Sequence, residues 1–211
     1  MKTDELVRML AADATVQAPP GLQLTRAALP AMIVTLALFA ALAGVRADVV
    51  QALGSPRFWL KLIVCIALAA TATGALLRAA RPQPGLGRWG TWLWLPAVAL
   101  VVAVASELVL LPAQQWGAAA IGHNATVCLL LVPTLAAAPL VASLLVLRRA
   151  APARPALAGA VAGLMSAGVG ALLYATHCTD DSPLFVALWY GGATAIVVAI
   201  GALAGRRLLR W

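Results

Sequence analysis

Long apolar stretches, separated by short polar turns, follow one another along most of the chain. Six of them approach the roughly 20 mostly apolar residues that an α-helix needs to cross a bilayer core. They are continuously apolar, whereas a strand of a membrane barrel alternates apolar and polar positions and is about half as long. The pattern therefore predicts an all-α fold, a polytopic membrane bundle of six transmembrane helices. The predicted spans are residues 29–45, 58–77, 92–111, 124–147, 156–176 and 184–204.

Basic residues are distributed unevenly between the two sides of this predicted bundle. Of the 15 Lys and Arg residues, three lie near the outer end of the second span: Arg46, Arg57 and Lys61. Cytoplasmic loops carry the excess of Lys and Arg. Both termini are therefore predicted to be cytoplasmic, which agrees with an even number of spans. The basic residues on that side are Lys2, Arg8, Arg26, Arg78, Arg81, Arg88, Arg148, Arg149, Arg154, Arg206, Arg207 and Arg210.

Composition supports a membrane protein and excludes several other classes. Apolar residues make up 63% of the 211 residues and charged residues 10%, whereas soluble domains are nearer half apolar and a quarter charged. Intrinsic disorder requires low hydrophobicity, and three cysteines are too few for a disulfide scaffold. The basic residues that give the net charge of +8 mainly set the orientation of the chain in the lipid bilayer, and some of them contact anionic lipid. No direct nucleic-acid partner is expected.

The chain divides into an N-terminal cytoplasmic segment, residues 1–26, and a transmembrane domain, residues 27–211. In the segment, Thr3 can cap a helix, Asp4 and Glu5 suit its positive end, and Leu6 and Leu10 fall on one face. Such a short helix is marginal alone in water. It needs a membrane surface, the bundle or a protein partner, and the alternative is a disordered cytoplasmic tail.

Glycines recur at four-residue spacing in the last two predicted spans. Gly159 and Gly163 form one such pair, and Gly201 and Gly205 form another. Small residues at this spacing let transmembrane helices approach closely. We predict that the fifth and sixth spans pack together within one chain, in preference to pairing two copies of it. The sequence leaves the oligomeric state open.

Two ionisable residues lie inside the predicted spans, where charges are costly and usually functional. Lys61 is about one turn into the second span, and Glu107 is about one turn from the outer end of the third. Consecutive antiparallel spans bring them to similar depth, so we predict that they pair. The alternative for Lys61 is that its long side chain reaches out to the headgroups.

All three cysteines fall in the outer half of the membrane in the predicted topology. Cys65 is in the second span, Cys128 in the fourth, and Cys178 at the outer end of the fifth. Thiolates bind thiophilic metals, and thiols near an oxidising compartment can form a disulfide. Cys128 and Cys178 are therefore a candidate thiol site that would hold metal transiently. The alternative is that each cysteine is a small buried hydrophobe.

The loop from His177 to residue 183 is the densest polar cluster in the chain. Asp181 or Ser182 can cap the sixth span, but capping does not account for His177 or Asp180. We include His177 in the candidate thiol site, because imidazole also binds such metals. Cys65, Asp180 and His123, which precedes the fourth span, are accessory candidates.

Motifs of enzymes are not found. The sequence has no P-loop, no HExxH and no Gly-x-Ser-x-Gly, so we expect neither catalysis nor a bound cofactor. A small transporter or channel would use Lys61 and Glu107 as a coupling pair. The lack of an internal repeat and the scarcity of intramembrane polar groups count against it. A structural subunit of a larger membrane complex is a further alternative.

Two stretches of this six-span chain are distinctive. One is the start, Met1-Lys2-Thr3-Asp4-Glu5-Leu6. The other, more specific, is His177-Cys178-Thr179-Asp180-Asp181-Ser182-Pro183 with Phe185, Trp189 and Tyr190. With these stretches, the chain resembles the NrsF family of polytopic membrane anti-sigma factors. The similarity covers nearly the whole chain.

The resemblance implies a function that composition does not indicate. Members of the family hold an extracytoplasmic-function (ECF) sigma factor inactive at the bacterial inner membrane and release it under heavy-metal or oxidative stress. The paired cysteines of the family correspond by position to Cys128 and Cys178, and Cys65 has no assigned place in the pattern. The N-terminal segment resembles the sigma-contacting part, with Asp4, Glu5, Leu6 and Leu10 as the contact residues.

Overall fold

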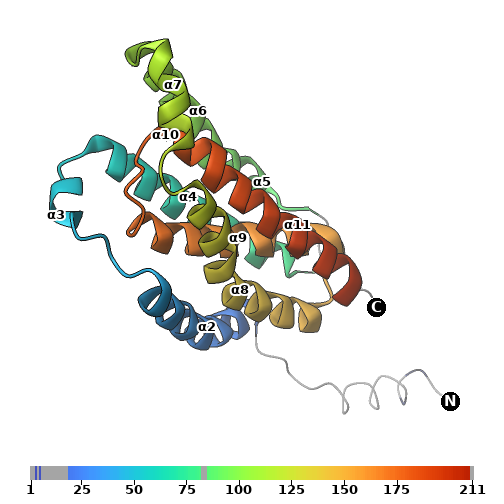
Figure 1. The fold of residues 1–211 in the computed structure, drawn as a ribbon. Helices are drawn as coiled ribbons and strands as arrows, with labels where there is room; N and C mark the ends of the chain where they lie inside the picture. The colour runs from blue at the N-terminus through green and yellow to red at the C-terminus, as the bar shows by residue number, and fades with distance from the viewer. Residues whose placement is uncertain (1–2, 4, 6–18, 82–84, 210–211) are drawn as a thin grey trace.

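The structure, a computed structural model, describes Thr3, Glu5 and residues 19–81 and 85–209 (Figure 1). The described residues form helices and connecting turns, without a β-strand. The elements are α2 (Pro20–Leu42), α3 (Val49–Ala52), α4 (Pro56–Ala79), α5 (Arg88–Trp92), α6 (Trp94–Leu110), α7 (Ala113–Ile121), α8 (Ala125–Ala150), α9 (Pro155–Ala175), α10 (Pro183–Phe185), the π-helix η1 (Val186–Tyr190) and α11 (Gly191–Leu208).

Six helical segments of the described chain are long and apolar enough to cross a membrane, which confirms the predicted six-span, all-α fold. Two of them contain more than one element. The third span combines α5 and α6, and the sixth combines α10, η1 and α11. The six segments are Gly21–Leu42, Pro56–Ala79, Arg88–Leu110, Ala125–Ala150, Pro155–Ala175 and Pro183–Leu208. The cytoplasmic orientation of the termini stays a prediction.

The first span begins earlier than predicted. α2 starts at Pro20, where the fixed φ of proline suits the first helical turn. It therefore continues through residue 26, where we expected the N-terminal segment to end. The helix stops at Leu42, because Gly44 adopts a φ of 71° and its backbone N–H turns back to the carbonyl oxygen of Phe39 at 2.8 Å.

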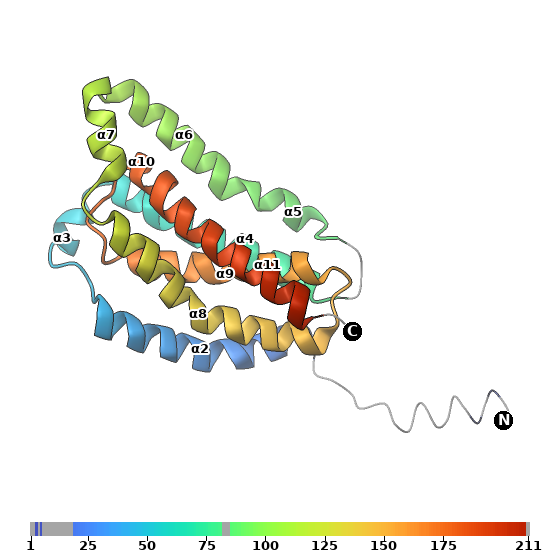
Figure 2. The same ribbon diagram turned by 45° about the vertical axis from the view of Figure 1, so that its right-hand side comes forward.

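Helix α9 lies at the centre of the bundle and packs against α4, α8 and α11 (Figure 2). α2 covers the far side of α8, and α6 packs against α4 at the edge. Buried residues of these helices form two apolar clusters. One surrounds Cys128 and Tyr174, and the other surrounds Leu76 and Leu147.

The predicted packing of the fifth and sixth spans is confirmed in α9 and α11. A Cβ added to Gly159 would clash with the carbonyl oxygen of Gly201 and would lie 2.8 Å from the Cα of Gly205. A Cβ on Gly163 would lie 2.7 Å from the carbonyl oxygen of Val197. The two backbones approach so closely that only hydrogen fits between them at these positions.

The bundle has two chemically different ends. The rim end contains α3, α7 and the rim loop, which we define as residues 176–182. The basic end contains the end of α4, α5, the end of α8, the start of α9 and the end of α11. Figure 2 shows the rim end at the left and the basic end at the right.

Candidate functional site: a polar rim above a thiol cluster

Lys61 forms a buried ion pair with the rim loop. Its Nζ lies 2.5 Å from Oδ1 of Asp181 and donates to the carbonyl oxygen of Cys178 at 2.8 Å. The Lys61 side chain is 1% exposed, so the alternative in which it reaches the headgroups is wrong. A charge this deeply buried requires a paired and hydrogen-bonded environment, and the rim loop provides it.

Glu107 does not pair with Lys61, so the predicted pairing is wrong. Its Oε1 lies 3.0 Å from Nη2 of Arg57 on α4, and its Oε2 accepts a 2.8 Å hydrogen bond from the Ser182 hydroxyl. The physical reason is the rim loop, which contacts both helices and supplies a separate partner to each charge. A transporter that couples through a Lys61–Glu107 pair therefore loses its structural basis.

Arg46 joins the end of α2 to the rim loop. Its Nη1 lies 2.9 Å from Oδ2 of Asp181, and its Nη2 lies 2.7 Å from Oδ2 of Asp48. The hydrogen bond between Arg46 and Asp48 stabilises both charges. It raises the pKa of Arg46 and lowers the pKa of Asp48 to about 2. Arg46 also donates to the carbonyl oxygen of Cys178 at 3.2 Å. Asp181 thus lies between two cations and does not cap the sixth span, a role taken by Ser182, which accepts from the N–H of Leu184.

Asp180 has a structural role that its prediction as an accessory sensing residue did not include. Its Oδ2 accepts hydrogen bonds from the backbone N–H of His123 at 3.0 Å and of Asn124 at 2.9 Å. It also accepts from Nδ2 of Asn124. Burial raises the pKa of Asp180, but the bonds from Asn124 and His123 outweigh it and hold the pKa below its usual value. The rim loop thereby holds in place the turn that leads into α8.

The two histidines lie in different surroundings. The His123 side chain is 94% exposed and has Nδ1 3.4 Å from Asp180. His177 is half-buried, with Nδ1 3.0 Å from the carbonyl oxygen of Gly44 and its ring against Tyr174. Because a carbonyl oxygen only accepts, this Nδ1 carries the proton. His177 therefore ties the rim loop to the end of α2.

The three cysteines are free and share one buried cluster directly beneath the rim loop. Cys65, Cys128 and Cys178 come from α4, α8 and the rim loop, and each is at most 3% exposed. Burial raises the pKa of the Cys178 thiol, and the charge of Lys61 offsets part of this rise. No group of three or more His, Cys, Asp or Glu side chains in the described part of the chain is arranged to hold a metal ion. In this state Cys178 is a protonated and shielded thiol.

Of the predicted sigma-contacting residues, Asp4, Leu6 and Leu10 lie outside the residues that the structure describes. Glu5 is helical and exposed. The assignment of this segment to a partner therefore stays a prediction.

Residues 10–211 match the NrsF family, which is described as a negative regulator of sigma F. The chain belongs to this family. The probable anti-sigma-F factor NrsF of Azospira oryzae is 35% identical over 214 residues, and the anti-sigma-F factor NrsF of Caulobacter vibrioides is 37% identical over 220 residues. Each alignment covers the full length of both chains. No solved structure matches this NrsF-family chain.

Sequence reasoning missed Tyr174 and Tyr190 as members of the thiol cluster. They are the only two tyrosines in the chain, and their rings lie 5.6 Å apart among the cysteines. Tyr190 ends η1, a π-helical turn, and such turns often occur at functional sites. Because tyrosine is rare in so apolar a chain, these two residues could have been recognised from the sequence as candidate members of the site. Arg46 was also missed, although it is one of few basic residues on its side.

Proposed function

We propose that this chain is a membrane-embedded anti-sigma factor that sequesters an ECF sigma factor and releases it when metal or oxidant engages Cys128 and Cys178. The observation that carries this proposal is full-length similarity to two proteins named as anti-sigma-F factors. The chain is then a multi-pass protein of the bacterial inner membrane with a regulatory, non-catalytic role. The sigma factor binds on the cytoplasmic side.

The buried thiols supply the input in this proposal. A soft cation displaces one proton from each thiol that it binds. Alternatively, hydrogen peroxide takes two electrons and two protons from the thiols of Cys128 and Cys178, which leaves one S–S bond and two waters. Because the thiols are shielded in the described state, either reagent must meet a state in which the rim loop has opened. The metal or oxidant then shifts the population toward the open state, because it binds or reacts with the thiols of that state only.

The helices supply the path from input to output. Cys128 is on α8, and Cys178 follows the end of α9. Both helices extend between the rim end and the basic end, in opposite directions, and α9 packs against α4, α8 and α11. A change in spacing at the thiols therefore alters the arrangement of helix ends at the basic end, where the N-terminal segment and the arginines would contact the sigma factor.

The thiol step is tested with the double variant Cys128→Ser, Cys178→Ser. We expect transcription from the sigma-dependent promoter to stay repressed and to lose its induction by metal or peroxide. Cys65→Ser is the matched control, because Cys65 is in the same cluster but outside the proposed pair, and it should keep induction. Unchanged induction in the double variant would refute the sensing role of these cysteines.

Sigma retention is tested by deleting residues 2–18, which leaves the start of α2 intact because the helix begins at Pro20. We expect the sigma factor to be lost from the solubilised complex and target transcription to become constitutive. Replacement of the same residues by a Gly-Ser sequence of equal length should have the same effect. Full repression with continued co-purification in both variants would exclude the N-terminal contact.

A further inference from the structure

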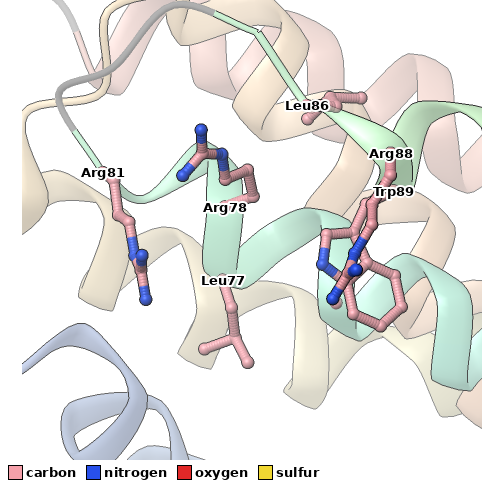
Figure 3. A pocket seen from close by; sticks show the side chains of 8 residues that line it. Leu77, Arg78, Arg81, Leu86, Arg88 and Trp89 are labelled. Atoms are coloured by element: carbon pink, nitrogen blue, oxygen red, sulfur yellow. The ribbon is translucent and has the colours of Figure 1, made fainter.

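A cavity of about 420 Å³ lies at the basic end, between the end of α4 and the start of α5 (Figure 3). This volume is within the roughly 300–1,000 Å³ typical of small-molecule sites. The cavity is lined by three arginines, three large apolar side chains and two glycines, and its described lining contains no acidic residue. The residues that define its chemistry are Leu77, Arg78, Arg81, Leu86, Arg88 and Trp89.

The apolar wall of the cavity is formed by Trp89 packed on α4. A Cβ added to Gly74 would collide with the six-membered ring of Trp89, so the glycine leaves the space in which the indole packs against the helix. Leu77 and Leu86 complete the apolar part. The cavity is therefore amphiphilic, with apolar walls and guanidinium groups around them.

The three arginines have no carboxylate partner within ion-pair distance among the described residues. Every ion pair of the described chain lies at the rim end. Guanidinium groups bind phosphate through paired hydrogen bonds as well as charge. Three such groups around one cavity, without an acid among the described residues to neutralise them, favour an anionic ligand.

The cavity lies where two predicted spans meet the membrane surface. α4 ends at Ala79 and the third span begins at Arg88, so the arginines are at headgroup depth, where Trp is also enriched. Beside the cavity, Trp92 and Trp94 are 51% and 69% exposed. Exposed aromatic side chains of a spanning helix face acyl chains.

We propose that this cavity binds the headgroup of an anionic phospholipid. Arg78, Arg81 and Arg88 hold the phosphate, and the acyl chains lie along the apolar surface of α5 and α6. Basic pockets between transmembrane helices bind anionic headgroups in this manner, and the anionic leaflet is the cytoplasmic one that the basic end is predicted to face. The inference is independent of sigma binding.

The test uses the full-length protein in detergent and native mass spectrometry, with phosphatidylglycerol and phosphatidylcholine of identical acyl chains as probes. The variant Arg78→Gln, Arg81→Gln, Arg88→Gln should bind phosphatidylglycerol about a hundredfold more weakly than the unaltered protein. The control Arg149→Gln, Arg206→Gln, Arg207→Gln removes the same charge from exposed residues of the same end. It should retain the affinity and the preference for phosphatidylglycerol.

Several outcomes would overturn the proposal. Equal losses in the two triple variants would assign binding to general surface charge. Competition by millimolar inorganic phosphate would assign the cavity to a soluble anion, and loss of sigma retention without loss of lipid would assign it to a protein. If the triple variant does not fold, the single variants Arg81→Gln and Arg88→Gln at exposed positions should each weaken lipid binding about fivefold. No change in either would equally reject the site.

Discussion

The two ends of the bundle use charge in opposite ways. At the rim end, charged side chains pair with one another, and four ion pairs connect the end of α2, the start of α4, the end of α6 and the rim loop. Asp180 of the rim loop also contacts His123, which precedes α8. At the basic end, the described arginines have no acidic partner. The rim charges therefore hold loops together, whereas the basic charges remain free to bind a partner or a lipid.

Burial explains the difference. Lys61 and Glu107 are at most 4% exposed, and an unpaired charge at that depth is strongly destabilising. The arginines of α8 and α11 are exposed, so water solvates them without a partner. The comparison predicts that charge removal destabilises the rim end and affects only binding at the basic end.

The largest expected effect follows from Asp181→Asn. This change leaves Lys61 buried without its carboxylate, which should lower the free energy of unfolding by about 3–5 kcal/mol. Thermal unfolding of the detergent-solubilised protein measures it. Asp48→Asn, at the half-exposed partner of Arg46, should have a much smaller effect. The double variant Lys61→Met, Asp181→Asn should recover part of the loss; strictly additive losses would show that the pair is not coupled.

The next effect tests the helix pair that connects the two ends. Gly159→Ala places a Cβ against the carbonyl oxygen of Gly201, so the helices must separate at a cost of about 1–3 kcal/mol. Gly191→Ala, where a Cβ meets nothing within 4 Å, is the control and should not destabilise. Equal unfolding temperatures for both variants would show that α9 and α11 tolerate separation.

A smaller effect is expected on the stability of the protein at acidic pH. The pKa of Asp180 is lowered in the folded protein, so its carboxylate stabilises the fold above its unfolded pKa near 3.9. That contribution is lost as the pH falls through the lowered pKa. In Asp180→Asn, the free energy of unfolding should decrease less steeply from pH 5 to pH 3, and the difference from the unaltered protein should be less than about 1 kcal/mol. Parallel curves for the variant and the unaltered protein would contradict this role; Glu5→Gln serves as the exposed control.

The smallest effect is expected at the basic end. The variant Arg149→Gln, Arg206→Gln, Arg207→Gln should change the free energy of unfolding by no more than about 0.5 kcal/mol. The same thermal measurement tests it against Asp181→Asn. A loss as large as that of Asp181→Asn would remove the distinction between the two ends.

Features that depend on a few neighbouring residues were predicted well. The six spans follow from local runs of apolar residues, and the α9–α11 contact follows from glycine spacing. Cys128 and Cys178 were placed in one half of the bundle by span depth, and the structure shows them in one cluster. The start of α2 was missed because the eight residues after Pro20 are less apolar than a core span, although they are helical.

Partners across the bundle were predicted poorly. Depth alone suggested that Lys61 faces Glu107, but depth does not give the path of the rim loop. That loop brings Asp181 to Lys61 and Ser182 to Glu107. The hydrogen bonds of Asp180 to the turn before α8 depend on the same path.

The sequence by itself determined the six apolar spans, the concentration of basic residues at one end and the scarcity of polar groups elsewhere, because each is a property of composition along the chain. Only the tertiary structure decided which charges pair, that Cys65 joins the other thiols, and that three arginines and Trp89 surround one cavity. The physical reason is that a buried charge or thiol takes its partner from whatever element packs beside it, and packing joins residues more than a hundred positions apart.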